Sequence, residues 1–149
     1  MAVVAMHPLA GLGQRNRINL WVRPAPATWD PVAAFSSGNL NLNLLTGYRL
    51  MRQWNAGVNL LTVVASESDQ AAARRFQDEL CDLARFPRNV ERTVLAGGFE
   101  RCLEDAPTAD ITLIGLPANR DASYLRRLVT LSRSTCIFVC DSGRESALV

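Results

Sequence analysis

The sequence contains no lysine and a single histidine, His7, among 149 residues. All sixteen basic residues are arginines, they are scattered, and the net charge is only +2, so no basic stripe predicts nucleic-acid binding. His7 lies in an unpatterned segment, so Ser-His-Asp and Cys-His arrangements have no base in the body of the chain. We therefore expect no catalytic residues and no enzyme activity.

The sequence also lacks a CxxC motif, a signal-like basic segment before its first apolar residues, and an apolar run long enough to span a bilayer. Zinc is disfavoured because no histidine lies near any of the four cysteines. We interpret these cysteines as free, mostly buried thiols in a reducing cytosol, and we expect no metal and no cofactor. The four are Cys81, Cys102, Cys136 and Cys140.

Short apolar runs do alternate with amphipathic stretches from Arg17 onward. Strands are expected at 18–22, 58–64, 90–95, 111–116 and 135–140, with helices between them, the longest over 40–54. Prolines at 24, 26 and 31 predict a loop after the first strand. This alternation predicts an α/β fold with a doubly wound, five-stranded parallel sheet. Residues 1–16 show no period, so we interpret them as a leader or linker remnant and 17–149 as one domain.

Numbering the five predicted strands along the chain, we expect the sheet order 3-2-1-4-5. The third strand is the most polar and should form one edge. The fifth strand should form the other, where Ile137, Phe138 and Val139 would make an apolar edge that needs a partner or a cover. We therefore interpret these three residues as a dimer edge, and the tail 141–149 as a segment that covers it or crosses to a second subunit.

The loops after the strands contain neither GxGxxG nor GxxxxGK[ST]. The predicted topology resembles the universal stress protein fold, whose nucleotide-binding members carry Gly, two residues, Gly, nine residues, then Gly with Ser or Thr. The first glycine aligns with Gly115, but Ala118 and Leu128 occupy the other two positions, and Pro117 removes a backbone N–H. The resemblance thus implies the fold without ATP or AMP binding.

Four segments are similar to the C-terminal domain of prokaryotic cation–chloride cotransporters of the Na-K-Cl type. They are INLWVR at 18–23, GNLNLNLL at 38–45 with Tyr48 and Trp54, AP at 106–107 and AD at 109–110 before IGLP at 114–117, and FVCDSGRESAL at 138–148. The resemblance implies an upstream transmembrane domain that couples chloride to sodium or potassium. It places this domain at the cytoplasmic face of the membrane and implies a homodimer with a regulatory role.

The family's ion-coordinating residues lie in its membrane helices, so the resemblance assigns none of them to this chain. The alternative interpretation is a free-standing, universal-stress-type protein that binds nucleotide. The incomplete glycine pattern after Gly115 favours the cotransporter domain.

Overall fold

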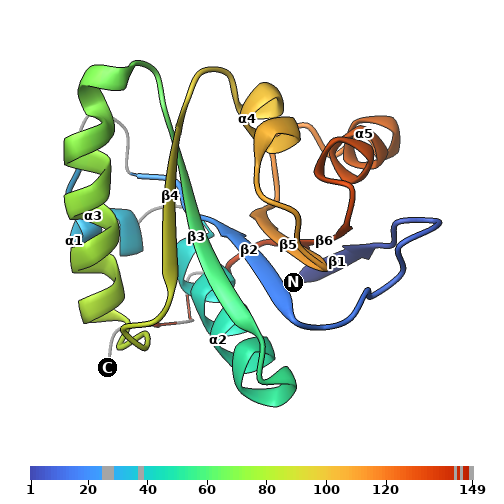
Figure 1. The fold of residues 1–149 in the computed structure, drawn as a ribbon, viewed down its shortest axis with the longest axis horizontal. Helices are drawn as coiled ribbons and strands as arrows, with labels where there is room; N and C mark the ends of the chain where they lie inside the picture. Colours follow the sequence, from blue (N-terminus) through green and yellow to red (C-terminus); the bar gives the residue numbers. More distant parts are fainter. Residues whose placement is uncertain (25–28, 37–38, 143, 145, 148–149) are drawn as a thin grey trace.

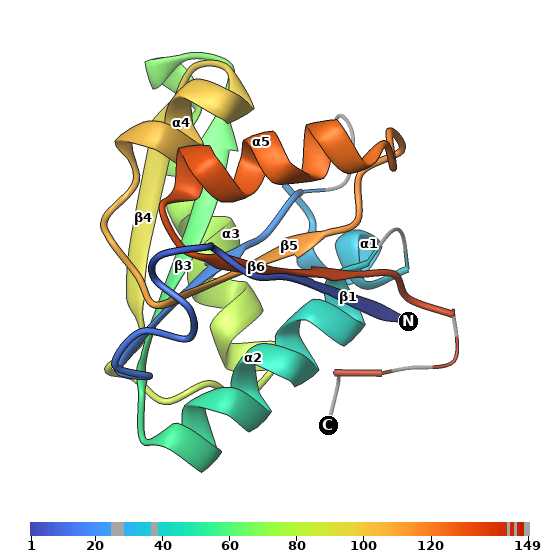
Figure 2. The same ribbon diagram turned by 90° about the vertical axis from the view of Figure 1, so that its right-hand side faces the viewer.

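The computed structural model describes residues 1–24, 29–36, 39–142, 144 and 146–147. A six-stranded sheet lies between α1, α2 and α3 on one face and α4 and α5 on the other (Figures 1 and 2). The strands are β1 (Ala2–Ala5), β2 (Arg17–Trp21), β3 (Gly57–Val64), β4 (Glu91–Ala96), β5 (Ile111–Gly115) and β6 (Thr135–Val139). The α-helices are α1 (Pro31–Phe35), α2 (Leu40–Trp54), α3 (Gln70–Leu83), α4 (Phe99–Asp105) and α5 (Ala122–Ser132), and a 3-10 turn, η1 (Glu67–Asp69), precedes α3.

The five predicted strands are β2 to β6, and they are parallel in the order β4-β3-β2-β5-β6. The predicted order 3-2-1-4-5 is therefore confirmed for these strands. The polar strand β4 forms an edge, as expected. The central strands β2 and β5 are buried almost throughout, because helices cover both faces of the sheet.

Strand β1 is not among the five predicted strands, and it corrects two expectations. It pairs antiparallel with β6, with Val3 opposite Phe138 and Val4 opposite Ile137, so the sheet is mixed and β6 is not an edge. Phe138 and Val139 are fully buried. The prediction that Ile137, Phe138 and Val139 form an exposed edge is wrong, because the segment interpreted as an unpatterned leader supplies a covering strand. The domain boundary at residue 17 stays a prediction.

Helix α1 lies in the stretch where the prolines predicted a loop. Asp30 caps the start of α1, and its side chain accepts a hydrogen bond from the Val32 N–H at 2.9 Å. Pro31 occupies the first turn, where its missing N–H would have no partner within the helix. Helix α2 has its predicted bounds, and the residue that follows it, Asn55, adopts a left-handed conformation with a φ of 50° that terminates the helix. Pro26 of the predicted loop and Ser37 and Gly38 of the expected cap lie outside the described residues.

Gly47 lets α2 lie close against the middle of the sheet. A Cβ at this position would overlap Leu20 Cδ1 of β2 and come within 3.3 Å of Leu113 Cδ1 of β5. Leu20 and Leu113 are fully buried and belong to the hydrophobic cluster beneath α2 and α3. This close approach places the middle of α2 over β2 and β5.

Candidate functional site at the carboxyl end of the sheet

The strand order reverses between β2 and β5. The chain runs outward from β2 to β3 and β4, then returns to β5 and continues to β6. Open α/β sheets bind ligands in the crevice beyond the carboxyl ends of the strands at such a point. The segments after Trp21 and Gly115, together with the start of α2, are therefore where a ligand would be expected.

Asn39, just before α2, occupies this crevice. Its Nδ2 donates to the Leu116 carbonyl at 3.3 Å, and its Oδ1 accepts a hydrogen bond from the Asp141 N–H at 2.9 Å. It thus joins the segments that follow β5 and β6. Asparagine at this position often caps a helix, but the side chain of Asn39 makes no cap hydrogen bond to α2.

Asn43 and Asn41 follow at alternate positions in α2. Asn43 is 2% exposed, and its Nδ2 donates to the Trp21 carbonyl at 2.8 Å, at the end of β2. Asn41 donates from Nδ2 to the Phe35 carbonyl of α1 at 2.8 Å and accepts from the Ala147 N–H at 2.9 Å. The asparagine–leucine segment therefore binds backbone groups around the crevice.

The glycine aligned with the phosphate loop is explained by the same asparagine. A Cβ on Gly115 would lie 3.2 Å from Asn39 Cβ and 3.3 Å from Asn39 Nδ2, so glycine makes room for the amide. Leu128, at the third glycine position of the nucleotide-binding pattern, is fully buried in the core under α5. Gly115 therefore faces an amide side chain, and the third position of the pattern belongs to the core.

The tail after β6 runs back to the start of α2. Ala147 is 4% exposed and packs in the cluster that contains Leu40 and Leu44. The expectation that the tail covers the edge of β6 is therefore wrong for its described residues, because the amides of Asn39 and Asn41 bind it at the crevice. Residues 143, 145, 148 and 149 lie outside the described residues.

A small hollow lies at the opposite, amino end of the sheet, near Asn19 and Asn59. Its volume is about 60 Å³, well below the roughly 300–1,000 Å³ of typical small-molecule sites. Asn19 Nδ2 donates to the Pro107 carbonyl at 2.7 Å, and Asn59 Oδ1 accepts from Thr93 Oγ1 at 3.0 Å. This hollow is too small for a nucleotide.

Asp110 fastens the segment before β2 at that same end. Its carboxylate accepts hydrogen bonds from the N–H groups of Gln14, Asn16 and Arg17 at 2.9, 2.8 and 3.0 Å. Partial burial opposes ionisation, but these three hydrogen bonds outweigh it and lower the pKa of Asp110. This carboxylate therefore holds the backbone of the segment before β2.

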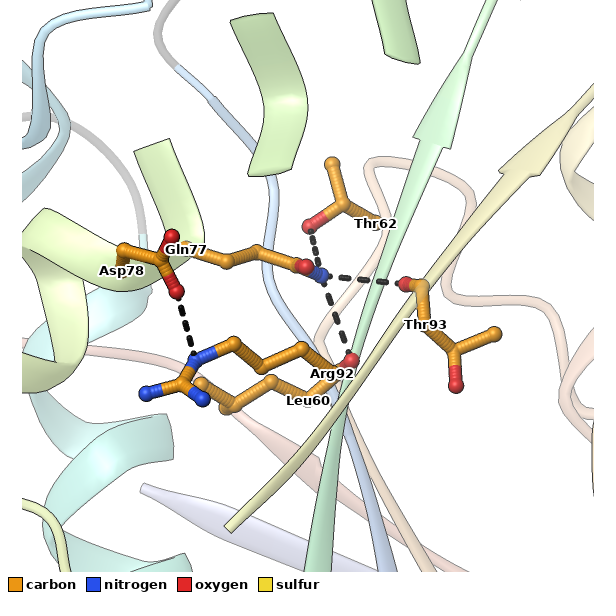
Figure 3. Close-up of polar contacts among 6 residues, drawn as sticks. All are labelled: Leu60, Thr62, Gln77, Asp78, Arg92 and Thr93. Carbon is orange, nitrogen blue, oxygen red and sulfur yellow. Dashed lines mark hydrogen bonds and ion pairs between the residues drawn. The ribbon is translucent and has the colours of Figure 1, made fainter. Parts of the chain in front are cut away.

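A buried glutamine, Gln77 of α3, was missed by the sequence analysis. Its Nε2 lies 3.0 Å from Thr62 Oγ1, 3.0 Å from the Thr93 carbonyl and 3.2 Å from the Leu60 carbonyl (Figure 3). Beside it, Arg92 Nε lies 3.0 Å from Asp78 Oδ1. Because these partners belong to α3, β3 and β4, the cluster fixes the helix on the sheet.

The cysteines lie where the sequence analysis expected them. Cys81, Cys102 and Cys136 are buried, Cys140 is partly exposed, and all four are free. Burial raises the pKa of Cys136 to about 11, even though a hydrogen bond to Ser132 lowers it. The described part of the chain brings together no group of three or more metal-ligating side chains. None of its helices has the length and apolar character needed to cross a bilayer.

Residues 13–148 match a family model described as "Prokaryotic cation-chloride cotransporter, C-terminal domain, 2nd". A solved structure, "Crystal structure of the cytoplasmic domain of a prokaryotic cation chloride cotransporter", is 33% identical in sequence and superposes with a TM-score of 0.82. The match covers 98% of this chain and 54% of that chain, so this chain spans about half the length of its relative. No curated protein matches the chain.

Proposed function

The chain belongs to the family of C-terminal domains of prokaryotic cation–chloride cotransporters, and from this premise we propose that it is a non-catalytic regulatory and dimerisation domain of such a transporter. The proposal places it at the cytoplasmic face of the membrane. A transmembrane domain of the same polypeptide would move chloride together with sodium or potassium. Two copies held close by their membrane parts would have a raised effective concentration, so a weak contact between these domains would suffice.

The side-chain contacts at the point where the strand order reverses are the observation that supports a non-catalytic role. Asn39 and Asn43 bind backbone carbonyls there, and the returning tail packs against α2. A nucleotide would have to displace these contacts, and Pro117 offers no N–H to replace them. This favours the cotransporter domain over the universal-stress-type nucleotide-binding protein.

Calorimetric titration with ATP and magnesium tests this part of the proposal. We expect no binding with a Kd at or below about 10 μM, which corresponds to roughly −7 kcal/mol. Asn39→Ala is the matched variant, because it shortens the side chain that fills the crevice. Binding of that affinity by the wild type would contradict the proposal, whereas binding by Asn39→Ala alone would show that this side chain excludes nucleotide from the wild type.

Sedimentation velocity tests the dimerisation role. We expect the sedimentation coefficient to rise with concentration from micromolar to millimolar protein, toward the value of a twofold dimer. Because β1 covers β6, the dimer must use a surface other than the predicted edge at Ile137, Phe138 and Val139. A monomer at every concentration would argue against self-association by this domain.

A further inference from the structure

The outer edge of β1 is the most apolar exposed part of the described chain. Five of the six exposed large hydrophobic residues lie among residues 1–9, which contain β1, and the sixth is Val32 of α1. The five are Met1, Val3, Val4, Met6 and Leu9. Successive side chains of a strand point to opposite faces, so Val3 and Val4 expose apolar surface on both faces of the sheet.

The backbone of β1 is open along the same edge. Met1 and Cys140 exchange two hydrogen bonds, at 2.8 Å from the Met1 nitrogen and 2.7 Å from the Cys140 nitrogen. In an antiparallel ladder such pairs alternate, so Val3 and Ala5 also face β6, while the N–H and C=O groups of Ala2 and Val4 point outward. This edge can accept another strand.

Only the short length of β1, four residues, limits pairing at this edge. Edge strands that face water usually carry charges, prolines or bulges that prevent them from joining other strands. Residues 1–6, MAVVAM, contain no charged side chain and no proline. An apolar strand with an unblocked edge is typical of the interior of a sheet.

We propose that β1 is an interior strand in the longer protein, and that a strand of the polypeptide preceding this chain pairs with its outer edge. The sheet would then continue into a neighbouring domain, whose side chains cover both faces of β1. The family match begins at residue 13, so β1 lies outside the matched domain although it completes the sheet of that domain. The similar cytoplasmic structure extends well beyond the match, since only 54% of it is covered.

Amide hydrogen exchange, measured residue by residue by NMR, tests this inference on two chains. One is the 149-residue chain, and the other is this chain preceded by the upstream polypeptide proposed above. We expect the Ala2 and Val4 amides to exchange freely in the shorter chain and at least about tenfold more slowly in the longer one. The Val3 and Ala5 amides, which face β6, should be protected in both and serve as the internal control.

Two results would overturn the proposal. Equal exchange of Ala2 and Val4 in both chains would leave the edge open to water. Protection in the 149-residue chain that rises with protein concentration would assign the edge to a second copy instead. That second result would leave the proposed dimerisation standing, so the two proposals are distinguishable.

Val4→Pro provides a variant that blocks the outer edge alone. Proline is tolerated on an edge strand when the missing N–H faces outward. In the longer polypeptide it should abolish the protection of Ala2, while the unfolding midpoint of the 149-residue chain should stay unchanged. Val3→Pro is the matched control, because it removes an inward N–H and should lower the midpoint of both chains. Unchanged protection of Ala2 in the Val4→Pro variant would contradict the inference.

Discussion

The sequence pattern at the start of α2 is not the pattern of a helix. In GNLNLNLL polar and apolar residues alternate with period two, which is typical of a strand, yet the segment begins a helix. Asn39 and Asn43 lie four residues apart, so both can reach the ends of the central strands, whereas Asn41 reaches α1 and the tail. Asn39 and Asn41 each donate and accept here, whereas Asn43 only donates, because its buried Oδ1 has no hydrogen-bond partner among the described residues.

Asp110 makes the stability of the fold dependent on pH. Its folded-state pKa is lowered, so the ionised carboxylate stabilises the fold above its unfolded pKa of about 3.9, and this contribution is lost as the pH falls through the folded pKa. We expect Asp110→Asn to lower the free energy of unfolding by about 1 kcal/mol at neutral pH, because water screens part of a charge-assisted contribution. Urea denaturation measured across pH gives this value.

The difference between Asp110→Asn and wild type should shrink as the pH falls below the unfolded pKa of about 3.9 and through the lower folded pKa, because the wild-type carboxyl then becomes protonated. Asp105→Asn is the control, since its ion pair with Arg101 lies on the surface and should contribute less than about 0.5 kcal/mol. A difference for Asp110→Asn that stays constant down to acid pH would show that the charge is not responsible.

Among the elements, α2 depends most on a single residue for its distance from the sheet. We expect Gly47→Ala to lower the free energy of unfolding by roughly 1–2 kcal/mol, because overpacking against buried Leu20 and Leu113 exceeds the gain of about 1 kcal/mol in helix propensity. The midpoint of urea unfolding measures the change.

Gly57→Ala is the matched control for that substitution. The nearest heavy atom to its new Cβ would be the Asn16 carbonyl oxygen at 3.8 Å, an ordinary contact, so stability should change by less than about 0.5 kcal/mol. If Gly47→Ala were as stable as Gly57→Ala, α2 would have room to move away from the sheet.

The elements whose apolar residues recur with a clear period are predictable from the sequence, and the short elements are not. Helix α2 and strand β3 are long enough for their apolar residues to reveal the period. Strand β1 has only four residues, AVVA, and both of its faces are apolar, so no alternation appears. Helix α1 has five residues, and its proline was interpreted as a loop signal although Pro31 stands in the first turn.

The candidate site was predictable only as a position in the fold. The topology places the crevice beyond the ends of β2 and β5, and the incomplete glycine pattern after β5 argues against a phosphate-binding loop. The occupants were not predictable, because Asn39 and Asn43 bind the carbonyls of Leu116 and Trp21. Backbone groups distant in the sequence carry no residue-specific signal.

At the scale of the whole molecule, the folded chain shields three of its four thiols. Burial raises the pKa of Cys81, Cys102 and Cys136, whereas Cys140, just after β6, is partly exposed. We expect iodoacetamide at about pH 8 to alkylate Cys140 first, because the other thiols lack both access and thiolate. Mass spectrometry of peptides over time follows each site.

Unfolding in urea provides the control for this experiment. All four cysteines should then react at similar rates, because the burial that separates them is lost. Fast alkylation of Cys136 in the native chain would mean that β6 opens readily, in conflict with its pairing to both β1 and β5.

The pairing of β1 with β6 also affects how the chain folds as it leaves the ribosome. The Met1 and Cys140 backbones are 139 positions apart, so β1 is synthesised first in this chain and its partner almost last. At about 5–20 residues per second, β1 waits roughly 7–30 s for its partner, and such long-range pairing is intrinsically slow. During that interval the apolar sequence AVVA lacks its partner β6, and chaperones can bind the edge that β6 later covers.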